Sequence, residues 1–95
     1  MANPQWTYLS NHGHVLVALS RDPGVRLRDV AVQVGITERA VQGIVADLVT
    51  AGHVVKDKAG RRNTYQVSRH SRFRHPLESG VRLGDFLDQV NSRPA

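Results

Sequence analysis

The side chains with the clearest chemical potential in this sequence are cationic, and they gather in one segment. The whole chain of 95 residues has a formal net charge of +5. Between His53 and His75 a single acid, Asp57, is outnumbered by the basic residues Lys56, Lys58, Arg61, Arg62, Arg69, Arg72 and Arg74. From Pro76 onward the balance turns slightly acidic, with Arg82 and Arg93 against Glu78, Asp85 and Asp88. This asymmetry indicates that one end of the molecule meets phosphate and the other meets protein.

Catalytic chemistry is not indicated by the residue pattern. The chain has no cysteine, no glycine-rich phosphate loop, and no spacing that brings a serine, a histidine and an acid together. His12 and His14 are close in sequence, as are His70 and His75, but residues two apart on a helix face different ways. Zinc needs three or four convergent ligands. We therefore expect no enzymatic activity, no metal and no other cofactor.

The size and composition suit one small cytoplasmic domain. A domain of this length buries only about 60–65% of its unfolded surface, so a partner subunit would add stability. The longest apolar run, Val15 to Leu19, is far too short to cross a membrane, and no signal-peptide pattern opens the chain. The absence of cysteine fits a reducing cytosol.

The stretch from Leu27 to Gly52 predicts two helices joined by a tight turn. Gly35 stands where a helix stop needs a left-handed residue, and Thr37 is suited to cap the next helix, with Glu38 in its first turn. Helix, three-residue turn and helix form a helix-turn-helix, in which the second helix reads bases. The apolar residues of both helices have the spacing of a buried stripe: Leu27, Val30, Ala31 and Val34, then Val41, Ile44, Val45 and Leu48.

The second helix of this pair has a polar outward face. Arg39 and Gln42 are the outward side chains suited to base edges, since arginine pairs with guanine and glutamine with adenine. Thr37 and the backbone N–H groups beside it can bind a phosphate. Asp47 is expected to repel phosphate and to tilt the C-terminal half of the helix out of the groove. The full outward set is Glu38, Arg39, Gln42, Gly43, Ala46, Asp47 and Thr50.

The preceding segments are expected to support this pair. Residues 1–10 form an irregular lead-in, in which Trp6 packs into a core or an interface and joins Tyr8 in stapling the chain to the first helix. That helix spans Asn11 to Arg21, with Ser10 or Asn11 as its cap, and Asp22-Pro23-Gly24 ends it. Its expected buried stripe is Leu9, His12, Val15, Leu16 and Leu19. In the following helix, Arg28 is equally well explained as a phosphate contact or as a solvated arginine.

After Gly52, two β-prone runs flank Lys58 to Arg61, which predicts a hairpin. Val54 and either Tyr65 or Val67 should point inward, while Lys58, Arg61 and Arg62 crowd the tip. Paired arginines at a turn are ordinary surface chemistry, yet directly after such a helix pair they suit a minor-groove or phosphate contact. The basic segment from Arg69 to His75 either crosses the DNA backbone or runs over the domain surface, anchored by Phe73.

Three helices followed by a basic hairpin resemble the winged helix-turn-helix of MarR-like and ArsR-like bacterial transcription regulators, over roughly residues 11–68. The resemblance rests on VGITERAV, LVTAGHV and GRRNTYQV, in this order and spacing. It implies an α+β, mainly α fold of three helices and a β-hairpin wing, to which this chain adds a C-terminal helix. It also implies a short bridging strand at Val25-Arg26, and places Gln42 and Gly43 where the recognition helix faces the groove.

Gly43 departs from the family pattern, in which a polar or basic side chain often stands at this position. Glycine inside a helix costs about 1 kcal/mol relative to alanine. Either the backbone approaches DNA closely here, or direct readout is weak and specificity shifts to the wing and to DNA shape.

The expected organisation is a lead-in (1–10), a winged helix-turn-helix (11–68), a basic linker (69–80) and a C-terminal amphipathic helix (81–95). If its own domain covered the apolar stripe of that last helix, the stripe would be core. Because an open linker separates it, we expect the stripe to pair with a second subunit in a homodimer matching a palindromic site. The stripe is Leu83, Phe86, Leu87 and Val90.

These features predict a sequence-specific regulator of transcription that binds double-stranded DNA. The recognition helix, about 38–51, would enter the major groove, and the wing, about 56–64, would meet the minor groove or the backbone. The alternatives are a winged-helix protein-interaction module, against which the polar recognition face counts, and a non-specific architectural DNA-binding protein. RNA binding lacks the usual aromatic platform. A small-molecule effector is unsupported, because so short a chain offers little room for a pocket.

Overall fold

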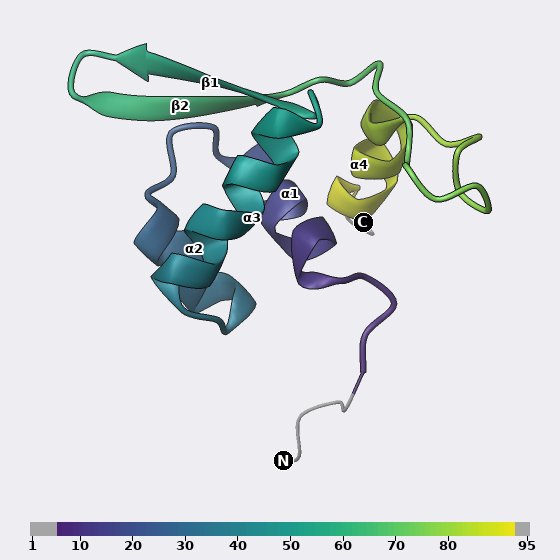
Figure 1. The fold of residues 1–95 in the computed structure, drawn as a ribbon, viewed down its shortest axis with the longest axis horizontal. Helices are drawn as coiled ribbons and strands as arrows, with labels where there is room; N and C mark the ends of the chain where they lie inside the picture. The colour runs from purple at the N-terminus through teal and green to yellow at the C-terminus, as the bar shows by residue number, and fades with distance from the viewer. Residues whose placement is uncertain (1–5, 93–95) are drawn as a thin grey trace.

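The computed structural model describes residues 6–92, and over these residues the fold is α+β and mainly helical. The elements follow the order of a winged helix-turn-helix with an added C-terminal helix, which confirms the predicted fold class (Figure 1). None of the described helices is both long enough and apolar enough to cross a membrane. In chain order the elements are α1 (Asn11–Arg21), α2 (Leu27–Val34), α3 (Glu38–Thr50), β1 (Val54–Ala59), β2 (Arg62–Val67) and α4 (Leu83–Asn91).

The predicted turn between α2 and α3 is confirmed. Gly35 ends α2 in the left-handed conformation, with φ of +86°, where a residue without Cβ avoids strain. Thr37 caps α3, because its hydroxyl accepts a hydrogen bond of 3.1 Å from the backbone N–H of Ala40. At the other end of α3, the N–H groups of Gly52 and His53 donate to the carbonyls of Val49 and Leu48, the Schellman pattern.

One hydrophobic core joins the helices, and most of the predicted stripes lie in it. The buried stripe predicted for α1 is wrong at His12, because the side chain of His12 is half exposed. Trp6 and Tyr8 are also exposed, at 68% and 94%, and their rings pack edge to face with centroids 5.1 Å apart instead of entering the core. The buried core residues of the three N-terminal helices and their turn are Val15, Leu16, Val17, Ala18, Leu19, Val25, Val30, Ala31, Val41, Ile44, Val45 and Leu48.

The wing is a two-stranded antiparallel hairpin that extends past the helices (Figure 1). Its register pairs Val54 with Val67 and Ala59 with Arg62, which leaves Gly60 and Arg61 as a two-residue turn. Gly60 has a φ of +65° and Arg61 does not have a positive φ, the pattern of a type II′ turn. Val54 and Tyr65 point into the core, as predicted, with exposed fractions of 1% and 3%.

The bridging strand expected at Val25-Arg26 is absent from the described residues. The turn before α2 instead makes one backbone hydrogen bond to the wing, from the N–H of Tyr65 to the carbonyl of Pro23, 2.9 Å long. The N–H of Val25 donates to the carbonyl of Asp22 at 3.1 Å, within the turn, so it is not available to pair with the wing.

Helix α4 packs on α1, and this corrects the dimerisation role expected for two residues of its stripe, Leu83 and Leu87. Leu83 and Leu87 are each only 2% exposed within the single chain, so they are core residues and cannot face a second subunit. Phe86 and Val90 are half-buried and pack against the same core. The expectation failed because residues 69–82 are not an open linker: they fold back on themselves and return α4 to α1.

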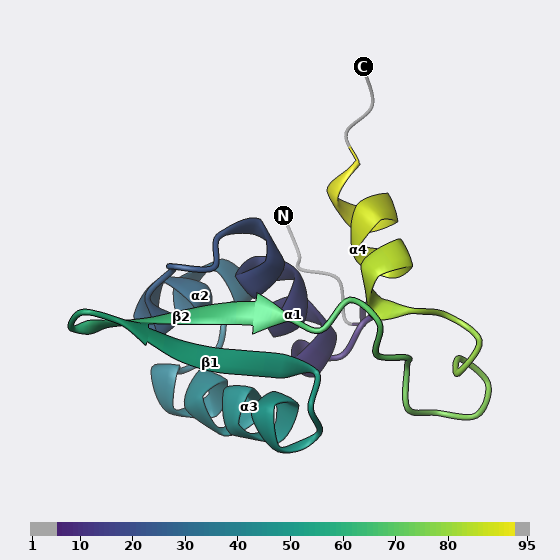
Figure 2. The ribbon, with the colours of Figure 1, turned by 90° about the horizontal axis from the view of Figure 1, so that it is seen from above.

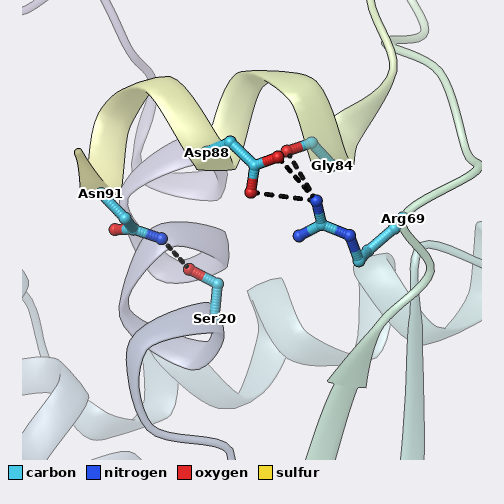
Figure 3. Close-up of polar contacts among 5 residues, drawn as sticks. All are labelled: Ser20, Arg69, Gly84, Asp88 and Asn91. Atoms are coloured by element: carbon cyan, nitrogen blue, oxygen red, sulfur yellow. Dashed lines mark hydrogen bonds and ion pairs between the residues drawn. The ribbon is translucent and has the colours of Figure 1, made fainter.

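Polar contacts hold α4 at both ends (Figure 3). Arg69 donates to the carbonyl of Gly84 near the start of α4, at 3.3 Å, and to both carboxylate oxygens of Asp88 further along the helix, at 2.9 and 2.8 Å. At its end, Asn91 donates to the hydroxyl of Ser20 at 3.1 Å. The side-chain oxygen of Asn91 also accepts from Nε of Arg21 at 2.7 Å. The Arg69 contacts tie α4 to the segment that follows β2, and the Asn91 contacts tie it to α1.

Candidate nucleic-acid interface

The outward face of α3 is polar, as the sequence predicted. Every residue of the outward set, from Glu38 to Thr50, is exposed. The one large apolar side chain exposed on α3 is Val49, and its exposed fraction is only 37%. The buried stripe of α3 packs against α1 and α2, so the polar face is turned away from the core. Such a face offers hydrogen bonds and little apolar contact area.

The wing tip and α3 approach each other around a polar hollow of about 450 Å³. Gln42 on α3 and Arg61 on the wing, both predicted site residues, line this hollow together. It is further lined by Arg26, just before α2, and by Asn63 on β2, two residues that the sequence reasoning did not single out. No local signal could identify them, because only the path of the hairpin brings them beside α3.

Arg62 also lines this hollow, and the remaining predicted DNA-contact residues are exposed but lie outside its lining. Arg39 and Gly43 are on the open face of α3, Arg28 is on α2, and Lys58 is on β1 near the wing tip. Thr37 stands at the start of α3, where unpaired backbone N–H groups and the helix dipole favour an anion. The structure therefore presents the predicted set as a surface running from α2 across α3 to the wing.

Arg62 has a different position from the one predicted. Its Nη2 donates a hydrogen bond of 2.6 Å to the carbonyl of Gly24, in the turn between α1 and α2. The side chain therefore reaches back from the wing toward the helices instead of crowding the tip with Lys58 and Arg61. Together with the bond from Tyr65 to Pro23, it braces the wing against the helical body.

Gly43 is not required by packing. A Cβ built at this position meets no heavy atom within 4 Å, so the folded chain has room for a side chain there. The absence of a side chain must have another reason, and both earlier explanations, close approach of DNA and weak direct readout, agree with this open space.

Asp47 does not simply project from the α3 face as a repulsive charge. One of its carboxylate oxygens lies 2.8 Å from Nε2 of His12 on α1. The pair remains half to two-thirds exposed, so its electrostatic contribution is small. It nevertheless directs Asp47 toward the side of α3 that faces α1.

A second and larger hollow of about 710 Å³ lies at the C-terminal end of α3. Its presence contradicts the expectation that so short a chain has little room for a pocket. The sequence could not predict it, because its walls come from the start of α1, the end of α3, the segment 69–82 and α4. Its apolar lining includes Leu9, Leu16, Phe73, Leu83 and Phe86, and its polar lining includes His12, Asp47, His53, Arg74, His75 and Glu78.

His53 is the group in this region whose ionisation the fold changes. Burial lowers its pKa below the ordinary 6.5, and the positive charge of Arg74 lowers that pKa further. The segment 69–82 thus brings a guanidinium close to His53, three residues beyond the end of α3. Although three histidines line the larger hollow, residues 6–92 contain no group of three or more side chains placed to hold a metal ion.

Comparison with known proteins adds no family to these observations. No protein-family model matches the chain, and no curated protein sequence matches it.

Proposed function

We propose that this protein binds double-stranded DNA as a sequence-specific regulator of transcription. One observation carries the proposal: the polar face of α3, with Arg39 and Gln42, lies beside a wing that holds Arg61 within the same hollow as Gln42. A major groove about 12 Å wide accommodates one α-helix, and guanidinium groups beside that helix are suited to the phosphates or the minor groove.

Each residue of the surface has a distinct role in the proposal. Arg39 and Gln42 read base edges, because their side chains can form paired hydrogen bonds with guanine and adenine. Thr37 and the first N–H groups of α3 bind a phosphate that fixes the helix in the groove. Arg28, Lys58 and Arg61 contact the backbone, and Gly43 either allows close approach of the helix or marks a position of weak direct readout. Arg62 acts indirectly by holding the wing in place.

The features of the fold favour double-stranded DNA as the partner over another protein or a single-stranded nucleic acid. A protein-interaction module would expose large apolar side chains on α3, and the partly covered Val49 is a poor anchor. Single-stranded nucleic acid is bound largely by stacking on aromatic rings. The exposed rings Trp6 and Tyr8 precede α1 and do not line the hollow between α3 and the wing.

The proposal includes a homodimer, because closed two-fold dimers are common and match palindromic sites. Its interface would have to use residues other than the core pair Leu83 and Leu87. Sedimentation at several protein concentrations would measure the oligomeric state directly.

A salt titration of binding to random duplex DNA and to the DNA upstream of the protein's own gene tests the function. A specific regulator should footprint the upstream DNA and bind it more tightly, with a steep salt slope. Arg39→Ala and Gln42→Ala should each reduce specific binding by about 1–3 kcal/mol and leave random binding nearly unchanged. Gln33→Ala, an exposed glutamine on α2, is the matched control.

The other outcomes select the alternatives. Equal, salt-sensitive binding to both DNAs would indicate an architectural protein. Absence of binding to either duplex near physiological salt would reject DNA as the partner and favour the protein-interaction module.

A further inference from the structure

The segment 69–82, here called the basic loop, carries an excess of exposed positive charge. Its acidic residue, Glu78, is outnumbered by four arginines. Of these, Arg69 is paired with Asp88 and so is committed to holding α4. Arg72, Arg74 and Arg82 are exposed, as are His70 and His75. Arg72 donates from Nη1 to the carbonyl of Gly80 at 3.1 Å, a bond within the loop, and its guanidinium keeps further N–H donors for a phosphate. Once the Arg69–Asp88 pair is set aside, the loop still presents net positive charge to solvent.

The basic loop has a defined path. It runs out and back as two antiparallel lengths, with a bridge between Arg72 and Arg82 and a hydrogen bond of 3.1 Å from the N–H of Phe73 to the carbonyl of Val81. The ring of Phe73 packs edge to face on Phe86, with centroids 5.1 Å apart, which confirms that Phe73 anchors the segment. Cations held on such a frame lose less conformational entropy when they bind than cations on a free linker.

The basic loop is attached to the C-terminal end of α3. The N–H of Ser68, just before the loop, donates to the carbonyl of His53 at 2.8 Å. Arg74 and His75 line the larger hollow together with Thr50, the last residue of α3. The loop therefore lies beside the end of α3, beyond the base of the hairpin.

The wing tip lies at the other end of α3. Arg61 shares the smaller hollow with Glu38, the first residue of α3, and with Gln42. Two views at right angles show the hairpin tip on the side where α3 begins and the loop on the side where it ends (Figures 1 and 2). Basic side chains thus stand beyond both ends of the proposed recognition helix.

The separation of these two positive regions suits the backbone of one duplex. Helix α3 has 13 residues and is therefore about 20 Å long, more than the major-groove width of about 12 Å. Charges beyond its two ends would lie over the phosphates on opposite sides of the groove that α3 occupies. We infer that the basic loop is a second DNA-backbone contact, in which Arg72 and Arg74 bind phosphates across the groove from the wing.

This inference rests on the proposed function, and it has a structural competitor. Cations near a helix C-terminus interact favourably with the helix dipole, so Arg74 would stabilise α3 even without DNA. The two explanations differ in what they predict. A phosphate contact changes the salt dependence of DNA binding, whereas a purely structural role changes only the stability of the fold.

The test is the salt dependence of duplex binding by the double variant Arg72→Gln/Arg74→Gln. Each lost phosphate contact should reduce the slope of log K against log salt by about 0.9. The loss of affinity between 50 and 200 mM salt should then be up to about tenfold smaller than in the unchanged protein. The footprint should shorten on one side. Arg72→Lys/Arg74→Lys should largely restore the slope, because lysine keeps the charge.

Arg21→Gln removes a positive charge from α1 and also the bond to Asn91, so it controls both for charge loss and for loosening of α4, and it should leave the footprint unchanged. If the double Gln variant melts at a lower temperature but keeps the slope and the footprint, the loop is structural and the inference is wrong. If Arg61→Gln reduces the salt slope of DNA binding and the double loop variant does not, the proposed function still holds, but the basic loop is not a second backbone contact. If the unchanged protein binds no duplex, both proposals fail together.

Discussion

Arg62 on the wing and Gly24 in the turn before α2 are joined by a hydrogen bond of 2.6 Å from the guanidinium to the carbonyl oxygen. Neighbouring Arg61 shares the wing tip but has no comparable bond in the described part of the chain. Two adjacent arginines, indistinguishable by sequence, therefore have different tasks. Arg61 is available to a ligand, and Arg62 positions the hairpin.

Arg61→Gln and Arg62→Gln should therefore have different effects. Arg61→Gln should lower the salt slope of DNA binding by about 0.9 and change the free energy of unfolding by less than about 0.5 kcal/mol. Arg62→Gln should destabilise the fold by about 1 kcal/mol or less, because it removes the bond to Gly24. Urea denaturation and salt titration measure both effects. If both variants change the free energy of unfolding and the salt slope equally, the hydrogen bond from Arg62 to Gly24 does not stabilise the wing.

Gly43→Ala should stabilise the protein. Alanine is favoured over glycine inside a helix by about 1 kcal/mol, and the added Cβ meets no atom within 4 Å. Ala46→Gly on the same exposed face is the reciprocal control and should destabilise by a similar amount. Thermal and urea unfolding would measure both variants, and an unstabilised Gly43→Ala would contradict the prediction.

The same variant distinguishes the two explanations for the glycine. Weaker DNA binding by the more stable Gly43→Ala protein would show that the α3 backbone approaches DNA closely. Unchanged affinity would leave weak direct readout as the reason.

The stability of the fold should decrease in mild acid because of His53. Its folded-state pKa lies below 6.5, through burial first and Arg74 second. The unfolded chain therefore binds this proton more readily than the folded chain, and the free energy of unfolding falls as the pH drops through about 6.5. Urea denaturation between pH 5 and 8 should show a smaller decline for His53→Gln than for the unchanged protein. The control, exposed His70→Gln, should keep the full decline; an equally steep decline in His53→Gln would contradict the assignment.

Leu87→Ala should destabilise the single chain by about 2–5 kcal/mol, because it leaves a cavity between α4 and the core. Leu77→Ala is the control, since Leu77 is 90% exposed and its truncation should change stability by less than about 0.5 kcal/mol. Chemical denaturation combined with sedimentation would separate the effects. If Leu87→Ala leaves the stability of the single chain unchanged and only abolishes subunit association, Leu87 has the dimerisation role that its burial contradicts.

The features that the sequence predicted correctly depend on short-range geometry. Apolar residues three and four apart must share a helix face, so the stripes of α2 and α3 follow from their spacing alone. Gly35, Thr37 and Gly60 act within a few residues of themselves, through a left-handed conformation, a cap and a turn. The exposed positions of Arg39 and Gln42 follow from the same helical period.

The features that required the tertiary structure depend on partners distant along the chain. His12 has the spacing of a core residue, yet Asp47, 35 positions away, holds it at the surface. The stripe of α4 has the same pattern whether a second subunit or its own domain covers it. The return path of residues 69–82 decides between these cases, because it carries Leu83 and Leu87 back against α1. Periodicity identifies which face of a helix is buried, but only the path of the chain determines what buries it.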